Sequence, residues 1–263
     1  MKYLAATLRL QFRTTLTFRF DLAVTVLRNV LTVCCLFALW TALFTGRTAV
    51  AGIDKNTMIL YAVASTILGV FLSMRVENNM AESIHKGNIA LMLARPIAYP
   101  LSLFMDAVAN TIVNAVTRIF PYLIAAVIGF CLAECAGMRI TGWLVISIAL
   151  SYILMFLYQV LFGSLVFWTM DIAGLIEYRD VVMMLFSGAI VPLYFFPDWL
   201  FRMAMFLPFQ AIYHTPLSIM IGRIDGSDAA MAVGLQLAWI VVLSLIARLV
   251  WRRAVRRVIV HGG

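Results

Sequence analysis

Charged residues are scarce in this sequence. Only 12% of its 263 residues are Asp, Glu, Lys or Arg, and 64% are hydrophobic, whereas a soluble domain carries about 25% charged residues. This scarcity excludes a soluble globular domain, and a mean hydropathy of +1.00 indicates an integral membrane protein. The net charge of +8 does not indicate a nucleic-acid partner, because the basic residues gather beside apolar segments, as they do at a membrane surface.

Motifs that carry chemistry are also missing. The sequence has no Gly-x-x-x-x-Gly-Lys-Ser/Thr, which excludes a P-loop, and no His-Glu-x-x-His or Gly-x-Ser-x-Gly. We therefore expect no catalytic residue, no cofactor and no metal in this chain. Four cysteines are expected to pack as small apolar residues, with a disulfide or metal site as the alternative for the second pair. They are Cys34, Cys35, Cys131 and Cys135.

A cleavable signal peptide is not expected. Arginines interrupt the N-terminal residues, and no short apolar core ends in a small-residue cleavage site. These arginines are Arg9, Arg13 and Arg19.

Six hydrophobic segments are candidates for membrane-spanning helices, each of which needs about 20 mostly apolar residues. The connections between them are short, so we expect a single transmembrane domain over residues 1–263. The predicted fold class is an all-α polytopic membrane protein with six transmembrane helices. The segments cover residues 22–44, 57–74, 101–133, 143–170, 181–213 and 229–251.

Lysine and arginine residues concentrate on one side of these segments. Most of the 20 fall before the first segment, between the second and third, after the fourth, and after the sixth. The positive-inside rule makes these parts cytoplasmic, which predicts a multi-pass membrane protein with both termini in the cytoplasm. A C-terminal basic cluster is expected to anchor the last helix to anionic lipid, with partner binding as the alternative. Its members are Arg252, Arg253, Arg256 and Arg257.

Residues 1–20 have an amphipathic pattern. Leu4, Leu8 and Phe12 recur at steps of four, whereas Arg9 falls on another face. The pattern predicts a helix that lies in the cytoplasmic membrane interface before the first span. A simple extension of the first transmembrane helix is the alternative.

The fifth segment is broken. A short apolar run from residue 181 is followed by Pro-Asp-Trp, and a second run contains Arg202. A helix that crosses, breaks and re-enters fits this pattern, since broken backbone survives at membrane depth only when it is buried in protein or lines a cavity. We predict a re-entrant segment within residues 181–222; an ordinary helix with an outer loop is the alternative. The residues expected to shape it are Pro192, Pro197, Asp198, Trp199, Pro208, Phe209, Pro216 and Gly222.

The third segment carries a polar stripe. Asp106, Asn110, Asn114 and Arg118 recur at steps of four, so they lie towards one side of a helix. An intramembrane charge should face a partner or a wet cavity, and the stripe is therefore a candidate for a subunit interface or a translocation path. Alternatively, Asp106 and Asn110 lie in the cytoplasmic interface and Arg118 snorkels towards it.

A polar, helix-prone insert, residues 77–96, separates the second and third segments on the cytoplasmic side. It ends in a proline that stops a helix. A half-buried amphipathic insert at this position is expected to be held by a soluble cytoplasmic partner. A second charged stretch after the fourth segment is expected to be a solvated loop, or else a second docking contact. Its members are Asp171, Glu177, Arg179 and Asp180.

Three stretches together resemble the permease subunit of type-2 ATP-binding-cassette (ABC) transporters, in the bacterial branch with six spans and a separate ATPase. Residues 87–96, Gly-Asn-Ile-Ala-Leu-Met-Leu-Ala-Arg-Pro, are similar to that branch's Gly-x-x-x-x-Leu-Leu-x-Arg-Pro pattern, with Met92 and Ala94 as departures from its commonest form. The other two stretches are Pro-Leu-Tyr-Phe-Phe-Pro-Asp-Trp-Leu at 192–200 and Leu-Pro-Phe-Gln-Ala-Ile-Tyr-His-Thr-Pro-Leu-Ser-Ile-Met-Ile-Gly at 207–222.

The resemblance implies partners and an architecture. It implies a dimer of permeases, identical or homologous, with two ATPase subunits that bind ATP and Mg docked on the cytoplasmic side, so that this chain itself is not an enzyme. It implies an interfacial N-terminal helix, a coupling helix between spans 2 and 3, and re-entrant helices after span 5. On this basis the residues in or beside the coupling element are Glu82, His85, Lys86, Gly87, Arg95 and Pro96.

The resulting hypothesis is the transmembrane subunit of an ATP-driven exporter of an apolar or amphiphilic solute or lipid. The alternative is a secondary transporter or channel that works alone through the polar stripe at 106–118. Such transporters often have two similar halves with matched broken helices, and this sequence has one broken element. An intramembrane enzyme is a third class, for which no catalytic constellation is present.

Overall fold

The structure is a computed structural model, and it describes residues 2–17, 19–47, 49–94, 97–119, 138–169 and 173–261. Within these ranges the chain is helical, apart from turns and one antiparallel hairpin. The hairpin consists of the strands β1 (Ala49–Val50) and β2 (Ile53–Asp54). The predicted all-α fold class is confirmed.

The helices follow one another with short connections. Near the middle of the chain, α6 continues directly into a π-helical stretch, η1. The bounds are α1 Lys2–Thr17, α2 Arg19–Leu43, α3 Lys55–Phe71, α4 Val76–His85, α5 Ile89–Leu93, α6 Tyr99–Asn114, η1 Ala115–Ile119, α8 Gly142–Thr169, α9 Ala173–Phe186, the 3-10 helix η3 Leu193–Phe195, α10 Asp198–Met205, α11 His214–Met220 and α12 Gly226–His261.

Within the described residues, four helical stretches are long and apolar enough to cross a membrane, and they correspond to the first, second, fourth and sixth predicted segments. Of the third predicted segment, α6 and η1 are described, and residues 120–137 lie outside the described ranges. The fifth is represented by α9, which has 14 residues. The total of six spans therefore stays a prediction. The four stretches are Ala23–Leu43, Lys55–His85, Gly142–Thr169 and Gly226–Arg256.

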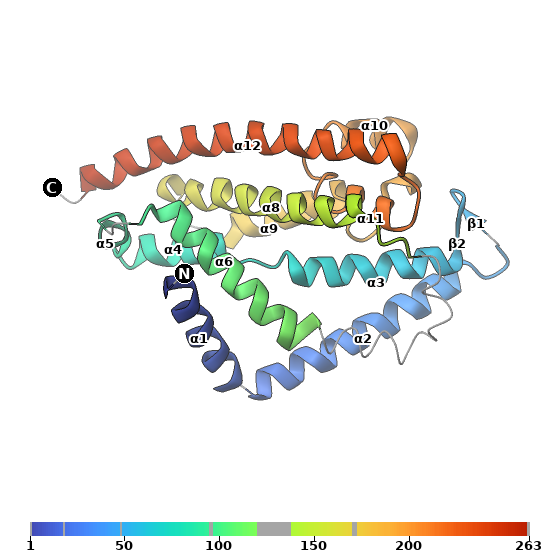
Figure 1. The fold of residues 1–263 in the computed structure, drawn as a ribbon, viewed down its shortest axis with the longest axis horizontal. Coiled ribbons are helices and arrows are strands. Elements are labelled where there is room, and N and C mark those ends of the chain that lie inside the picture. Colours follow the sequence, from blue (N-terminus) through green and yellow to red (C-terminus); the bar gives the residue numbers. More distant parts are fainter. Residues whose placement is uncertain are drawn as a thin grey trace.

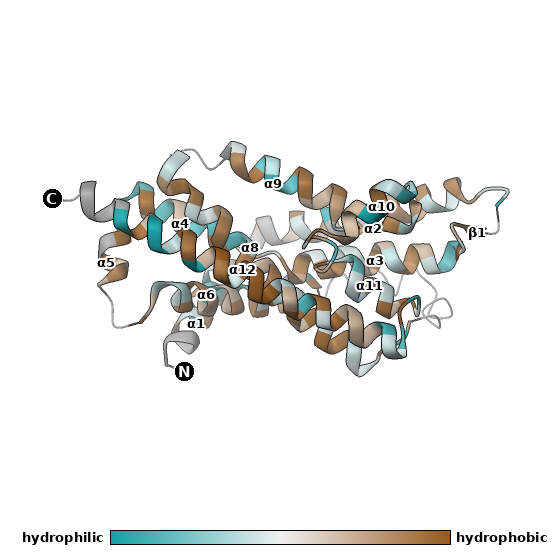
Figure 2. Ribbon diagram, turned by 90° about the horizontal axis from the view of Figure 1, so that it is seen from above, coloured by the Kyte–Doolittle hydropathy of each residue, from teal (hydrophilic) through white to brown (hydrophobic). Residues whose placement is uncertain are grey.

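Helix α8 lies at the centre of the fold. It packs most extensively against α12 and next against α4, while α2 packs against α3. Figure 1 shows α4, α5 and the C-terminal end of α12 at one end of the molecule, and the β1–β2 hairpin and α10 at the other. Apolar residues predominate along α12, and hydrophilic residues appear towards its C-terminal end (Figure 2). The insert that we expect to be cytoplasmic therefore shares an end with the basic C-terminal cluster.

Helix α1 is separate from α2. Figure 1 shows the two helices at an angle, and α1 packs against α6. Arg9, Leu10 and Arg13 are exposed on its surface. The N-terminal helix is thus not a straight extension of the first long helix; its place in a membrane interface stays a prediction.

Helix α3 has a well-defined start. The Asp54 carboxylate accepts hydrogen bonds from the backbone N–H of Thr57 at 3.0 Å and from its hydroxyl at 2.6 Å, and so caps the helix. Partial burial raises the pKa of Asp54, but these hydrogen bonds outweigh it and hold the pKa below its ordinary value. At its other end α3 stops after Phe71, and the chain becomes helical again at Val76.

The core forms where α3, α8 and α11 meet. Tyr61, Leu154 and Ile212 are fully buried there. All residues of the short helix α11 are buried as well. Residues 210–212, just before α11, are buried too, and burial in protein is one environment in which irregular backbone is tolerated at membrane depth.

Candidate functional site

The break between α3 and α4 is held by polar side chains of α6. The Asn110 amide donates to the Ser73 carbonyl at 3.0 Å, and the Asn114 amide to the Ser73 hydroxyl at 3.4 Å. The Thr111 hydroxyl donates to the Phe71 carbonyl at 3.4 Å. Carbonyl groups released at a helix break need such partners where water is excluded. These α6 residues therefore fix the break from which α4 starts.

The two ends of the polar stripe lie in different clefts. Asp106 lines two clefts beside α4, of about 280 and 250 Å³, and Arg118 lines a third cleft beside α2. Asn110 and Asn114 lie between these ends and contact the α3–α4 break. The structure thus separates the ends of the stripe, and its role as an interface or path stays a prediction.

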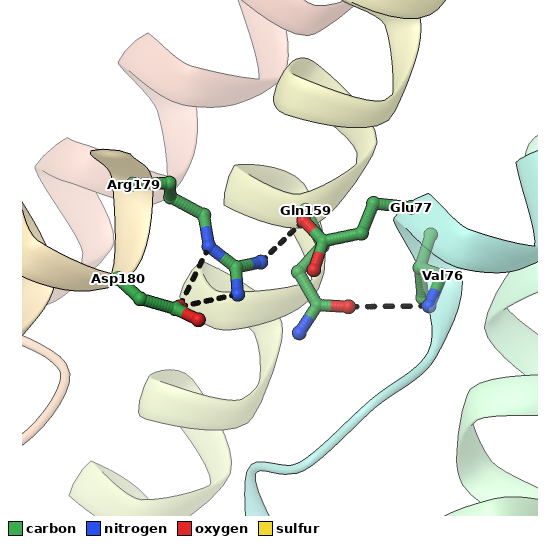
Figure 3. Close-up of polar contacts among 5 residues, drawn as sticks. All are labelled: Val76, Glu77, Gln159, Arg179 and Asp180. Atoms are coloured by element: carbon green, nitrogen blue, oxygen red, sulfur yellow. Dashed lines mark hydrogen bonds and ion pairs between the residues drawn. The ribbon is translucent and has the colours of Figure 1, made fainter. Parts of the chain in front are cut away.

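A buried ion pair joins the start of α4 to α9. The Arg179 guanidinium donates to the Glu77 carboxylate, and the two side chains are only 7% and 3% exposed (Figure 3). Arg179 also donates from Nε to the exposed Asp180 carboxylate at 3.1 Å. From α8, Oε1 of Gln159 accepts a hydrogen bond of 3.2 Å from the backbone N–H of Val76. Two other helices therefore fasten the first turn of α4.

The prediction of a charged loop after the fourth segment is wrong. Glu177, Arg179 and Asp180 lie on α9, and Arg179 is buried; Asp171 lies outside the described residues. The sequence pattern predicts that the fifth helix begins at residue 181, where an uninterrupted apolar run starts, but α9 already begins at Ala173. A buried arginine whose partner lies 102 positions away in the sequence leaves no local pattern, so this ion pair was missed.

Helix α4 approaches α8 very closely at Gly163. A Cβ atom added at Gly163 would lie 2.8 Å from the sulfur of Met80 and 3.1 Å from the Cα atom of Glu77. The end of the methionine side chain can move, but the α4 backbone cannot move without disturbing the Glu77–Arg179 pair. The missing side chain at Gly163 therefore sets the distance between the two helices.

The far end of α4 and helix α5 are accessible. Nζ of Lys86 lies 2.6 Å from Oε1 of Glu82, and the two side chains are 63% and 62% exposed. Gly87 follows with a φ of +69°, a left-handed conformation that favours glycine, and turns the chain into α5. His85 is exposed, and Leu91 on α5 is 70% exposed.

Four of the six residues carried over from the family resemblance thus gather in one exposed turn. Leu91, next to this turn on α5, is also exposed. The sequence did not predict its exposure, because Leu91 lies within an apolar run. The remaining two lie outside the described residues; they are Arg95 and Pro96.

The irregular chain after α9 has its carbonyl groups held by side chains of other helices. The Tyr61 hydroxyl of α3 donates to the Gly188 carbonyl at 2.7 Å, and the Ser65 hydroxyl donates to the Ala189 carbonyl. In a regular helix these two carbonyl groups would accept hydrogen bonds from backbone N–H groups. Here the side chains of α3 supply the donors and hold the segment against α3.

The turn before α11 is held in the same way. Nε2 of Gln236 on α12 donates to the Ala211 carbonyl at 2.7 Å, and the Ser151 hydroxyl of α8 donates to the same carbonyl at 3.2 Å. The Gln236 amide also donates to the Ser147 carbonyl at 3.2 Å. One buried glutamine therefore ties together α8, α12 and the entry to α11.

The residues predicted to shape the broken element lie at the ends of short helices. Pro192 and Pro197 directly precede η3 and α10, and Asp198 is in the first turn of α10. Pro216 lies in the first turn of α11, where proline is tolerated, and Gly222 follows with a φ of +73°. The others are Trp199, which is 67% exposed on α10, and Pro208 and Phe209, in the turns before α11.

Cys34 and Cys35 are free and exposed on α2, so these small apolar residues do not pack in the interior of this chain. Helix α2 contacts the rest of the fold on part of its surface only, and these thiols lie on the remainder. Cys131 and Cys135 lie outside the described residues. In the described part of the chain, no group of three His, Cys, Asp or Glu is placed to hold a metal ion.

Comparison with known families agrees with the helical, apolar character of the fold. A family model described as ABC-2 family transporter protein matches residues 30–262, a stretch that includes α4, α5, α9, α10 and α11. A search of the curated proteins gave no match. Because the family model covers most of the chain, the protein belongs to the ABC-2 family of transporter proteins, as a membrane-embedded permease component.

Proposed function

We propose that this permease is driven by separate ATPase subunits that dock on the exposed turn between α4 and α5. One observation carries the proposal: the helix that presents this turn is anchored at its other end inside the protein. Its tip, residues 82–87, is charged and accessible, whereas its first turn is buried through Glu77. A soluble partner can bind the tip of α4. Because the other end of α4 is anchored inside the protein, a movement of the partner would be transmitted to the helices that contact this anchor.

The anchor leads to the irregular segment. Helix α4 is about 15 Å long for its ten residues, and its contacts with Gly163 and Arg179 connect it to α8 and α9. Helix α9 runs directly into the irregular chain at Ser187–Ala189, which α3 holds by hydrogen bonds. Coupling between distant sites is carried by packed, hydrogen-bonded elements of this kind. Movement of α4 would therefore shift the segment before α10.

The complete transporter is proposed to contain two ATPase subunits and a second permease, identical or homologous to this one. Both termini and the α4–α5 turn lie on the cytoplasmic side of the bacterial plasma membrane in this proposal. The shared end of α4, α5 and the basic C-terminal part of α12 supports it. ATP binding would draw the ATPases together, tilt the permease helices through α4, and expel an apolar or amphiphilic solute or lipid.

The proposal is tested by substitutions at the accessible turn. Lys86→Glu combined with Leu91→Asp places two negative charges on the docking surface and removes its exposed apolar side chain. Loss of a central interface contact costs about 2 kcal/mol or more, so we expect at least a tenfold drop in the ATPase recovered with the tagged permease from mild detergent, and the same drop in permease-dependent ATP hydrolysis.

The matched control is Arg202→Glu, an exposed charge reversal on α10 at the opposite end of the molecule. It should recover as much ATPase as the unchanged protein. Unaltered ATPase recovery and hydrolysis in the Lys86/Leu91 variant would contradict the docking site. A permease that purifies without any ATPase, and whose flux follows an ion gradient, would support the stand-alone transporter instead.

A further inference from the structure

The largest of the three clefts described here opens between α2, α3, η1 and the irregular segment after α9. It measures about 410 Å³. Its wall includes the irregular backbone at Ala189 and Ile190 and the side chain of Tyr213, just before α11. The broken element that the sequence predicts therefore lines a cavity, as broken backbone in a membrane is allowed to do.

Two arginines face this cleft from different elements. Arg28 comes from α2, and Arg118 comes from η1 at the end of the polar stripe. None of the described residues that line the cleft is acidic. Two cationic side chains that line one cleft give it a positive charge, and an intramembrane charge is expected to face a partner or a wet cavity. The charge of the cleft therefore suits an anionic ligand.

Three hydroxyl groups that line the cleft donate within their own helices and do not compete for this task. Thr32 donates to the Arg28 carbonyl at 2.9 Å, Thr66 to the Ala62 carbonyl at 2.8 Å, and Ser73 to the Val70 carbonyl at 2.8 Å. Their hydrogens are thus used within their own helices. A guanidinium group offers five N–H donors, so it can contact protein groups and a phosphate, sulfate or carboxylate at the same time.

The surface next to Arg28 is apolar. Leu31 lies one turn along α2 and is 55% exposed, and Leu27 lies one turn before Leu31 and is 60% exposed. Residues three and four apart on a helix are neighbours on its surface. A ligand with its acid group between the arginines can therefore lay an apolar chain along α2.

We propose that this cleft binds the acid group of an anionic amphiphile, held by Arg28 and Arg118, with its apolar part on the exposed face of α2. The binding site is inferred from the cleft alone. The further step, that the bound molecule is also the transported one, rests on the proposed exporter function. If both hold, the transported solute is an amphiphile that carries a negative charge.

Native mass spectrometry of the full-length protein in detergent tests the site, with phosphatidylglycerol as the anionic probe, phosphatidylcholine as the zwitterionic probe and inorganic phosphate as a competitor. One arginine contributes about fivefold to the binding of an acidic lipid. We expect Arg28→Gln to weaken phosphatidylglycerol binding about fivefold, Arg118→Gln to do the same, and phosphatidylcholine binding to be weak and unchanged. Arg28 is exposed on α2, so its substitution should leave folding intact.

The control is Arg202→Gln, which removes an exposed charge from α10, away from the cleft and from the basic C-terminal cluster, and should leave phosphatidylglycerol binding unchanged. Equal loss in this control, equal binding of the two lipids, or unweakened binding in both cleft variants would overturn the proposal. Full displacement of the lipid by millimolar inorganic phosphate would assign the cleft to free anions and overturn it as well. ATPase recovery with the Arg28→Gln variant reports separately on the proposed function, since Arg28 lies away from the docking turn.

Discussion

Gly163 is the residue at which α4 and α8 come so close that no side chain fits. Replacing it with alanine puts a methyl group 3.1 Å from the Cα atom of Glu77, so the helices must separate. Overpacking of this kind costs about 1–3 kcal/mol. We expect Gly163→Ala to lower the free energy of unfolding by that amount, measured by chemical unfolding in detergent micelles.

Gly234→Ala is the matched control, because a Cβ atom at this α12 position would meet nothing within 4 Å. A helix gains up to about 1 kcal/mol from such a change. Equal stability changes in the two alanine variants would show that Gly163 does not set the α4–α8 distance.

Glu77 and Arg179 form the buried ion pair that anchors α4 to α9. Removing one partner leaves the other charge buried, which costs about 3–5 kcal/mol, whereas removing both avoids that penalty. We therefore expect Glu77→Gln and Arg179→Gln each to be more destabilising than the double variant. A double-mutant cycle of unfolding free energies measures the difference.

The exposed pair of Glu82 and Lys86 serves as the comparison for this cycle. Its side chains are more than half exposed, and because solvent screens such pairs they contribute little to stability. A coupling energy for Glu77 and Arg179 as small as that of the exposed pair would contradict their role as an anchor.

At the scale of the elements, the irregular segment between α9 and α11 depends on side chains from neighbouring helices. Gln236 donates to the carbonyls of Ala211 and Ser147, and its loss leaves the Ser151 hydroxyl to hold the Ala211 carbonyl. The net loss of a hydrogen bond costs about 0.5–1.5 kcal/mol. We expect Gln236→Leu to destabilise the protein by this amount and to speed proteolysis between α10 and α11.

Ser244→Ala, also on α12 and only half-buried, should have little effect on either measurement. Cleavage rates that rise equally in the two variants would point to general loosening of α12. In that case Gln236 would not specifically hold the turn before α11.

At the scale of the whole molecule, the structure places the α4–α5 turn and the C-terminal end of α12 together, with the β1–β2 hairpin at the opposite end (Figure 1). We expect a reporter that is active only outside the cytoplasm to be inactive when fused after Gly263. The same reporter inserted at Gly46, which has open space around its Cα atom, should be active. Activity at Gly263 would reverse the proposed topology.

Several features follow from local pattern alone. Long apolar runs specify α8 and α12, because each must satisfy its backbone hydrogen bonds internally in a bilayer. The polar, helix-prone run between the second and third segments predicts the accessible α4–α5 region, because charged side chains are seldom buried unless they are paired. Proline spacing likewise predicts the interruption after α9.

Other features depend on contacts between residues far apart in the sequence. The Arg179 side chain looked like part of a solvated loop, and it is buried because Glu77 from another helix neutralises it. The sequence placed Asn110 and Asn114 on a candidate interface or path, and only the structure shows that both donate to Ser73 at the break between α3 and α4.

The sequence by itself therefore determined the membrane class, the family and the exposed turn, since hydropathy, charge placement and turn residues act over short distances. Only the tertiary structure decided which polar residues satisfy the broken helices and which two arginines share a cleft. The physical reason is that a buried polar group is stabilised by its partner, and the partner is brought to it by packing rather than by position in the chain.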